Sequence, residues 1–442
     1  MLFRRKATML LGEWKEQSNG KYAALLEGAR RVGKSTIAED FAKKNYRSYI
    51  KVDFAEIDSE TLSVFDSIAH IDEFFLRLQA ITGKVLHKRE SVIILDEIQL
   101  QPKVRQAIKY LVADGRYDYI ETGSLLSIKK NTKNIVIPSE EWKIPVYPMD
   151  FEEFLWATGI GSYDLLKTAF EADSPLGQAV NRKLMRSFRL YMAVGGMPQA
   201  VEAFIDKQPF KAIDRVKRRI IDLYEDDFYK IDGSGRTSML FDSIPAQLAR
   251  GGKKYSVGFA LKKKARSKDF EHLSDLINSK TVIPCFNCTD PRISFSSSKD
   301  INTFKLYLAD TGLFVSLLLK TGAYTEEELY SKLLSDKLPA NLGYLYENAM
   351  AQTFTAKGND LYYMTWSKPN SFHSYEVDFL LRRNSKTIPV EIKSSRLKPH
   401  DSIDAFTSKF SSAVTNPCIL SQKDFEKDGA ISNYPFYLAS FL

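Results

Sequence analysis

The sequence has few cysteines and no long apolar run. Cys285, Cys288 and Cys418 are the three cysteines in 442 residues, and so sparse and odd a set argues against a disulfide framework and for a reducing compartment. Cys285 and Cys288 form one C-x-x-C, but no second pair or nearby histidine completes a zinc site, so we favour packing over metal binding. The longest apolar run, LFVSLLL, is too short to cross a membrane, and the N-terminus lacks the apolar stretch of a signal peptide. We expect a cytoplasmic protein.

The length of the chain indicates the number of domains, and its charge indicates the kind of partner. A chain of 442 residues exceeds a single core, so we expect roughly three domains at about 100–200 residues each. The net charge of +8 and the pI near 9.0 favour an acidic partner such as nucleic acid, provided that the basic residues cluster.

One stretch, EGARRVGKSTIAEDFA (Glu27–Ala42), fits the phosphate-loop pattern G-x-x-x-x-G-K-[ST]. An apolar segment before it predicts a strand, and KSTIAEDFAKKN after it predicts an amphipathic helix. Backbone N–H groups of such a turn would wrap a β-phosphate, Lys34 would reach the β- and γ-phosphates, and Ser35 would hold Mg²⁺. Two loop arginines either add charge near the phosphates or pair with carboxylates elsewhere. The predicted ATP-binding residues are Gly28, Ala29, Arg30, Arg31, Val32, Gly33, Lys34, Ser35 and Thr36.

A second segment, SVIILDEIQ, predicts a central parallel strand that ends in Asp96 and Glu97. Asp96 at this end would bind Mg²⁺ through water, and Glu97 would orient or deprotonate the attacking water, so we predict that Lys34 and Glu97 are catalytic. The alternative is a solvated acidic pair that starts a helix.

A third segment, YDYIETGSLLSI, predicts a neighbouring strand that ends in polar residues. Thr122 and Ser124 are placed there to sense the γ-phosphate. A simple strand-to-turn cap is the open alternative.

Beyond residue 148 the pattern becomes helical, and we predict a lid over residues 149–232 that couples the nucleotide state to the rest of the chain. After the polar break IDGSGRTS we expect three helices, the last at Lys268–Ile283, and then two strands. That order is typical of a winged helix, predicted over residues 233–325. The run GGKKYSVGFALKKKARSK has no acidic residue and predicts contact with DNA phosphates, with a solvated face or a protein-docking module as alternatives. The predicted DNA-binding residues are Lys262, Lys263, Lys264 and Arg266.

The last segment, SYEVDFLLRRNSKTIPVEIKSS, predicts an antiparallel hairpin. Alternation brings Asp378, Glu391 and Lys393 to one surface. Two carboxylates there would chelate Mg²⁺ and the lysine would activate or position a water. The alternative is a set of cross-strand salt bridges on a solvated sheet.

The chain resembles a known family in GARRVGKST, IILDEIQ, ETGSLLSI, YPMDFEEFL, YMAVGGMPQAV, LADTGLFVSLL, GYLYENAMAQTF and EVDFLL with IPVEIKSS. These segments look like AAA-type ATPases of bacteria and archaea that carry a C-terminal domain of unknown function, and they run through nearly the whole chain. The resemblance implies ATP binding and leaves the biological role open.

The hairpin also resembles the PD-(D/E)xK core of restriction-type nucleases, which implies an αβββαβ order and catalytic roles for Asp378, Glu391 and Lys393. It also implies that the metal is held by Glu347 with Asp378 and Glu391. Glu376-Val377 stands where the proline-aspartate signature is expected, which is a departure from that pattern.

Together these features predict an α/β protein with a P-loop core over residues 1–148, the lid, the winged-helix-like part and a nuclease-like domain over 326–442. The leading hypothesis is that ATP regulates binding or Mg²⁺-dependent cleavage of double-stranded DNA. The alternatives are a nucleotide-dependent switch, in signalling or defence, whose last domain binds a partner without cleaving DNA, and a nucleotide-binding protein with slow turnover. A homo-oligomer is a further expectation, since an arginine of one AAA subunit often completes its neighbour's site. The candidates are Arg105, Arg116, Arg182 and Arg186.

Overall fold

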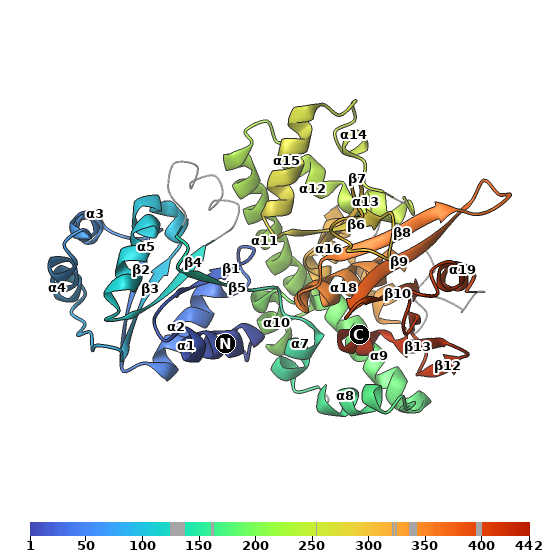
Figure 1. The fold of residues 1–442 in the computed structure, drawn as a ribbon, viewed down its shortest axis with the longest axis horizontal. Coiled ribbons are helices and arrows are strands. Elements are labelled where there is room, and N and C mark those ends of the chain that lie inside the picture. The colour runs from blue at the N-terminus through green and yellow to red at the C-terminus, as the bar shows by residue number, and fades with distance from the viewer. Residues whose placement is uncertain are drawn as a thin grey trace. The chain divides into compact units, whose positions relative to one another are not determined.

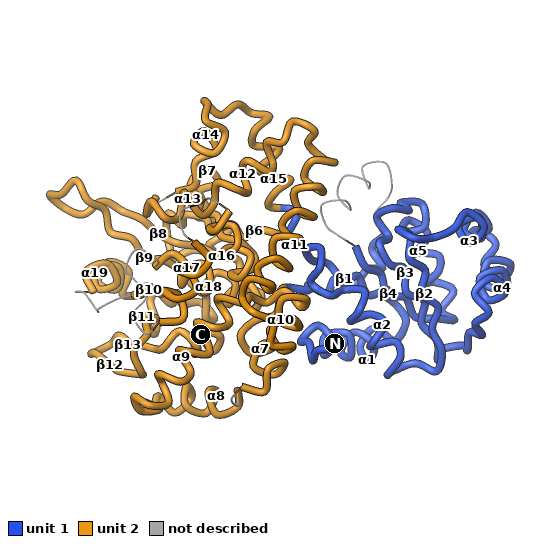
Figure 2. Tube along the Cα trace, turned by 180° about the vertical axis from the view of Figure 1, so that it is seen from behind, with its two compact units in different colours: residues 1–147, 278–280 blue, residues 148–277, 281–442 orange. Residues whose placement is uncertain are grey.

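The computed structural model describes residues 1–123, 138–160, 163–252, 254–320, 322, 325–335, 343–394 and 400–442. The chain divides into two compact units (Figure 2). Unit 1 comprises residues 1–147 and 278–280, and unit 2 comprises residues 148–277 and 281–442. Unit 2 thus contains the regions predicted as lid, winged helix and nuclease-like domain.

Unit 1 is built on a five-stranded sheet in which all neighbouring strands are parallel, in the order β2-β3-β4-β1-β5 (Figure 1). This confirms the predicted parallel α/β core. The strands are β1 (Ala23–Glu27), β2 (Ser48–Asp53), β3 (Ser91–Asp96), β4 (Asp118–Gly123) and β5 (Glu141–Pro145). The helices are α1 (Lys6–Ser18), α2 (Lys34–Asn45), α3 (Ser59–Ser63), α4 (Ile71–Thr82) and α5 (Pro102–Asp114), with 3₁₀ turns η1 (Val64–Ser67) and η2 (Ile98–Leu100).

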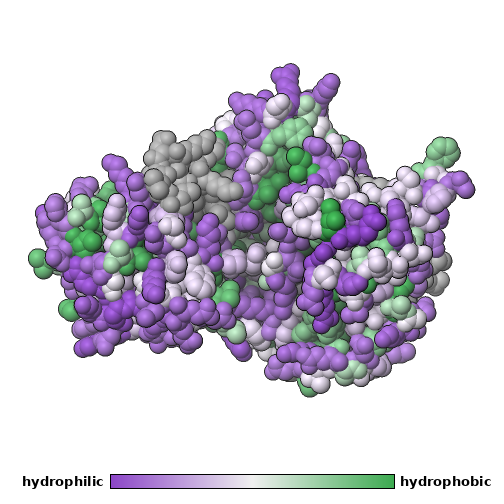
Figure 3. All heavy atoms as spheres, viewed as in Figure 1, coloured by the Kyte–Doolittle hydropathy of each residue, from purple (hydrophilic) through white to green (hydrophobic). Residues whose placement is uncertain are grey.

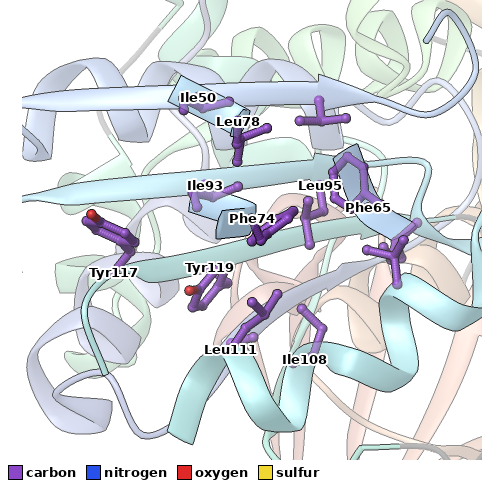
Figure 4. Packing of buried hydrophobic residues seen from close by; sticks show 14 of the residues in the cluster. Ile50, Phe65, Phe74, Leu78, Ile93, Leu95, Ile108, Leu111, Tyr117 and Tyr119 are labelled. Carbon is purple, nitrogen blue, oxygen red and sulfur yellow. The ribbon is translucent and has the colours of Figure 1, made fainter. Parts of the chain in front are cut away.

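The core of unit 1 determines which strand residues face the functional site. One face of the sheet packs Ile93, Leu95 and Tyr119 against apolar residues of α4 and α5, including Ile108 and Leu111 (Figure 4). Because successive strand residues alternate between faces, the last polar residues of β3 and β4 lie on the other face, the one that α2 contacts. All six residues of β3 are buried, as expected for a central strand covered on both sides.

Unit 2 combines helices with an eight-stranded mixed sheet in the order β12-β13-β11-β10-β9-β8-β6-β7. The strands are β6 (Val282–Cys288), β7 (Lys299–Leu308), β8 (Leu361–Ser367), β9 (Ser374–Arg383), β10 (Lys386–Lys393), β11 (Cys418–Ser421), β12 (Glu426–Asp428) and β13 (Ile431–Pro435).

The helices that precede this sheet are α7 (Phe151–Thr158), α8 (Tyr163–Glu171), α9 (Gln178–Val194), α10 (Pro198–Ile205), α11 (Phe210–Ile231), α12 (Arg236–Asp242), α13 (Ile244–Ala249), α14 (Val257–Ala260) and α15 (Ser267–Asn278). The later ones are α16 (Thr311–Lys320), α17 (Glu326–Leu334), α18 (Gly343–Ala356) and α19 (Asp401–Lys409), with the 3₁₀ turn η4 (Phe436–Phe441) at the end.

The region predicted as a winged helix differs from the expectation in three ways. The described residues form four helices here, α12 to α15, rather than three, and α12 already begins at Arg236 within the polar break. α15 ends at Asn278, and residues from Val282 onward pair in β6. The antiparallel β6–β7 hairpin is present, but β6 also pairs in parallel with β8. The hairpin is therefore part of the sheet that contains the strands of the predicted nuclease-like domain, and the predicted boundary at residue 325 does not separate two sheets.

The order of helices and strands in the C-terminal region agrees with the order predicted from the sequence. The described elements run α18, β8, β9, β10, α19 and β11, which is the predicted αβββαβ order. β9 and β10 form the predicted antiparallel hairpin, and Asn384 at its turn adopts the left-handed φ of 57° that suits asparagine. Figure 1 shows β8 and β9 as a long hairpin that extends beyond the rest of this sheet.

Apolar residues are concentrated in the cores. On the face shown in Figure 3, hydrophilic residues predominate and hydrophobic ones appear in separate groups. Within the described part of the chain, no helix is long and apolar enough to cross a membrane.

Candidate functional site

The loop between β1 and α2 has the conformation of an anion cradle. Arg31 and Gly33 both have left-handed backbones, with φ of 69° and 97°. A Cβ at Gly28 would lie 2.1 Å from the carbonyl oxygen of Val146, so only glycine fits there. The loop thus presents backbone N–H groups at the N-terminus of α2, where the helix dipole also favours an anion.

Lys34, the first residue of α2, lies inside this loop. Its side chain is buried, and Nζ donates to the carbonyl oxygens of Gly28 at 3.1 Å and Ala29 at 2.9 Å. Burial lowers the pKa of Lys34 to about 8, although the nearby carboxylates of Glu97 and Asp96 oppose this effect. The ammonium group is therefore held where a phosphate would approach the loop.

Asp96, at the end of β3, joins three elements of the site. Its Oδ1 accepts hydrogen bonds from Ser35 Oγ at 2.7 Å and from Thr122 Oγ1. Its Oδ2 forms an ion pair with Lys51 Nζ at 3.2 Å. The predicted convergence of Ser35, Asp96 and Thr122 is therefore present.

Magnesium ions prefer hard oxygen ligands. The adjacent Ser35 hydroxyl and Asp96 carboxylate supply such oxygens, and they lie beside the loop that suits phosphate. These residues fit the group that the phosphate-loop motif implies.

Glu97 follows Asp96, the last residue of β3, and the backbone turns at this position. Its φ is 55°, a left-handed value that is uncommon for glutamate and is found at functional turns. Its backbone N–H donates to Thr122 Oγ1 at 3.2 Å, and its Oε2 accepts from Gln99 Nε2. The turn thus directs Glu97 away from the strand while Gln99 orients its carboxylate.

The remaining predicted loop residues are placed as follows. Val32 is buried, Arg30 is half-buried, and Arg31 and Thr36 are exposed. Ser124 lies outside the described residues.

Two residues of unit 1 were missed by sequence reasoning. Arg5 is buried and donates from Nη1 to the loop carbonyl of Val32 at 2.8 Å and from Nη2 to Tyr147 O at 2.7 Å. Lys51, on β2, pairs with Asp96 and lies 3.8 Å from Glu39 of α2. Arg5 carries no local signal, whereas Lys51 could have been found as a cation on the sheet face opposite the apolar core.

Arg105 was a candidate for the arginine that completes the ATP site of a neighbouring subunit, but it binds a carboxylate of its own chain instead. Its guanidinium binds Glu141 in a bidentate fashion, with both distances 2.7 Å, and both side chains are at most 2% exposed. Arg116 pairs with Asp114 and Asp72 at 2.8 Å. Arg182 and Arg186, on α9 in unit 2, are exposed. A shared arginine stays a prediction, and Arg105 is unsuited to it.

Arg105→Ala should destabilise unit 1 strongly. The change leaves Glu141 buried without its partner, beside the fully buried Glu121, and breaking a buried pair costs about 3–5 kcal/mol. Arg47→Ala is the matched control, because Arg47 and Glu90 form an exposed pair at 3.1 Å that is worth about 0–1 kcal/mol. Urea unfolding of both variants measures the difference. Equal losses of stability would contradict a structural role for Arg105.

The predicted carboxylates of unit 2 are partly brought together. Asp378 Oδ2 accepts from the backbone N–H of Ile392 at 2.8 Å, which places it beside Glu391 on the neighbouring strand. Glu391 is buried and pairs through Oε1 with Lys393, while its Oε2 has no hydrogen-bond partner among the described residues. Burial and the negative charge of Glu347 raise the pKa of Asp378 well above its usual value.

An additional cation, Lys305 of β7, lies among these acidic groups. Its Nζ is 2.6 Å from Glu376 Oε1 and 3.7 Å from Glu347 Oε2, and Glu347 also accepts from Tyr307 at 3.2 Å. Burial alone would lower the pKa of Lys305, but Tyr307 and the surrounding carboxylates raise it well above its usual value. We call Lys305, Glu347, Glu376, Asp378 and Glu391 the carboxylate cluster.

The carboxylate cluster does not fit a divalent metal ion as it stands. Among the residues that the structure describes, no group of three or more His, Cys, Asp or Glu side chains is arranged to hold a metal. The ammonium group of Lys305 contributes a positive charge between two of the acidic side chains. Both residues of the cysteine pair are buried, and Cys288 contacts Ser298 Oγ at 3.1 Å.

The predicted basic run lies on the surface. Lys262, Lys263, Lys264 and Arg266 are all exposed in the segment between α14 and α15. Lys263 is 3.6 Å from Asp269, so part of its charge is compensated. Lys253, from the same run, lies outside the described residues.

Comparison with known families assigns unit 1. Residues 20–155 match the AAA domain, residues 185–324 match a domain of unknown function (DUF8612), and residues 342–436 match another (DUF4143). The match and the phosphate-loop geometry define a P-loop ATPase. The chain is an ATP-hydrolysing enzyme that carries a P-loop ATPase domain of the AAA type.

Several solved structures resemble the chain weakly, and no curated protein matches it. The Walker-type ATPase of Pyrococcus abyssi has 17% identity, covering 72% of this chain and 96% of its own, with a TM-score of 0.43. The RuvB Holliday junction branch migration motor of Thermotoga maritima has 13% identity, with coverages of 63% and 89% and a TM-score of 0.27. For Cdc6p of Pyrobaculum aerophilum the identity is 12%, the coverages 75% and 92%, and the TM-score 0.23. Likenesses this weak do not extend the assignment beyond the AAA domain.

Proposed function

We propose that unit 1 binds ATP with Mg²⁺ and that its hydrolysis controls the binding of double-stranded DNA by unit 2. The observation that carries the ATPase part is the convergence of Lys34, Ser35, Asp96 and Thr122 at the ends of β1, β3 and β4. The exposed basic segment before α15 supports the DNA part, because clustered lysine and arginine neutralise backbone phosphates.

Each side chain of the nucleotide site has a role that its position supports. Ser35 and Asp96 would hold Mg²⁺, which supplies positive charge to the phosphates when bound. Lys34 would exchange its loop carbonyl partners for phosphate oxygens. Glu97 would accept a proton from the attacking water, and Thr122, which contacts both acidic residues, would transmit the presence of the γ-phosphate to β4.

DNA cleavage by unit 2 is a second candidate function. The adjacency of Asp378 and Glu391, with the unpartnered Glu391 Oε2, favours it. The lysine within the carboxylate cluster opposes it. The two candidates are separated by incubating plasmid and linear DNA with the protein and Mg²⁺ or Mn²⁺, with and without ATP, beside an Asp378→Ala variant. Cutting that disappears in Asp378→Ala would establish a nuclease.

Neutralising Lys262, Lys263 and Lys264 together by alanine should weaken DNA binding and its salt dependence. Each phosphate contact contributes about −0.9 to the slope of log affinity against log salt, so losing three contacts should reduce the slope by up to about 2.7. Fluorescence anisotropy with a labelled duplex over a salt series measures it. The control is alanine at Lys386, Lys423 and Lys427 together, three exposed lysines elsewhere in unit 2, which removes the same charge. An unchanged slope would exclude this segment from the DNA interface.

A further inference from the structure

The lysine of the carboxylate cluster comes from an element outside the predicted nuclease motif. Lys305 lies on β7, the outermost strand at its end of the sheet, and it is opposite Cys285 of β6. Its side chain nevertheless contacts Glu376 on β9, so it lies across the strands in between, β6 and β8. Only 4% of Lys305 is exposed.

The contacts of Lys305 are those of a counter-ion for several carboxylates. Its Nζ is bonded to Glu376 at 2.6 Å and is 3.7 Å from Glu347, which comes from α18. A buried ammonium is stable only when acidic partners compensate its charge. The carboxylates of Glu347 and Glu376 are partly buried and are stabilised by a nearby cation, which Lys305 supplies from within the chain.

Lys393, the lysine that the motif predicts, forms an ion pair with a different carboxylate. It pairs with Glu391 and its side chain is 22% exposed, whereas the Lys305 side chain is 5% exposed. The structure therefore contains two lysines at the cluster, one for Glu391 and one for Glu347 and Glu376. A divalent ion that used Glu347 would have to compete with the Lys305 ammonium for this carboxylate.

We infer that Lys305 takes the place of a divalent cation in the carboxylate cluster, so that unit 2 binds no Mg²⁺ there and does not cut DNA. This inference rests on the proposed function in one respect, the comparison of unit 2 with a nuclease. Of the two candidate functions of unit 2, DNA binding and DNA cleavage, it favours binding without cleavage. Its consequence is that a metal site should appear when the ammonium group is removed.

The test is a Mn²⁺ titration of the full chain without nucleotide, followed by the electron paramagnetic resonance signal of free Mn²⁺. The main variant is Lys305→Met with Glu376→Gln, which removes one charge of each sign and leaves Glu347, Asp378 and Glu391 available. We expect it to bind one Mn²⁺ at least about 10-fold more tightly than the wild type. Adding Asp378→Asn should abolish the gain. Lys386→Met, an exposed lysine of β10, is the control and should change nothing.

Two results would overturn the inference. One is a wild-type Mn²⁺ site that Asp378→Asn removes, and this result needs no Lys305 variant to fold. The other is a folded Lys305→Met, Glu376→Gln protein, checked by its thermal unfolding, that binds Mn²⁺ no better than the wild type. ATP turnover of each variant is measured in parallel. If the proposed ATPase function is wrong, the wild type itself will not hydrolyse ATP. If only this inference is wrong, the wild type will hydrolyse ATP and only the Mn²⁺ results will differ from those expected.

Discussion

Glu97→Gln should slow ATP turnover by about 100- to 10,000-fold while leaving ATP binding unchanged. The glutamine keeps the size of the side chain and the hydrogen bond from its backbone to Thr122, but it cannot accept a proton from water. Phosphate release at saturating ATP measures turnover, and binding of a fluorescent ATP analogue measures affinity.

A matched control separates this effect from a general loss of charge. Glu90→Gln removes an exposed carboxylate just before β3 that pairs with Arg47, and its turnover should equal that of the wild type. Wild-type turnover in Glu97→Gln would show that another group activates the water. A parallel loss of ATP affinity would show that Glu97 acts in binding instead.

Lys34→Ala should weaken ATP binding by about 100-fold or more. Hydrogen bonds from a charged donor contribute about 1.5–3 kcal/mol each, and the ammonium group is positioned to give two to phosphate oxygens. Without nucleotide it donates to two loop carbonyls instead, so the alanine variant also leaves these acceptors without a partner. Isothermal titration with a slowly hydrolysed ATP analogue and Mg²⁺ measures the affinity.

Lys44→Ala is the control for this variant, because Lys44 is on the same helix, is exposed and pairs with Asp40. It should bind nucleotide as the wild type does. Wild-type affinity in Lys34→Ala would contradict the phosphate-loop assignment, provided that thermal unfolding shows an intact unit 1.

The nucleotide site could be predicted from sequence because its parts are local. Gly28 to Ser35 are consecutive, and the loop geometry follows from a strand, a turn and a helix in succession. Asp96 and Thr122 each end a buried strand, and neighbouring parallel strands end at the same edge of a sheet. Sequence periodicity was therefore sufficient to bring them together.

The residues that sequence reasoning missed depend on distant contacts. Arg5 reaches a loop 27 positions later, and no local pattern predicts that pairing. Lys305 enters the carboxylate cluster because β6 and β7 join the sheet of β8 to β10, whereas the sequence suggested a separate winged helix. A lysine in the apolar segment TFKLYL was the available signal, since a buried lysine requires acidic partners.

The most direct test of the central claim compares the DNA affinity of the full chain in two nucleotide states. The Glu97→Gln variant is used with ATP, which it should hold without turnover, and with ADP, and anisotropy of a labelled duplex is measured at low salt. Because coupling between two sites is reciprocal and typically amounts to about 1–3 kcal/mol, we predict DNA affinities that differ by about fivefold or more between ATP and ADP. Equal affinities, or no DNA binding in either state, would contradict control of DNA binding by the ATPase.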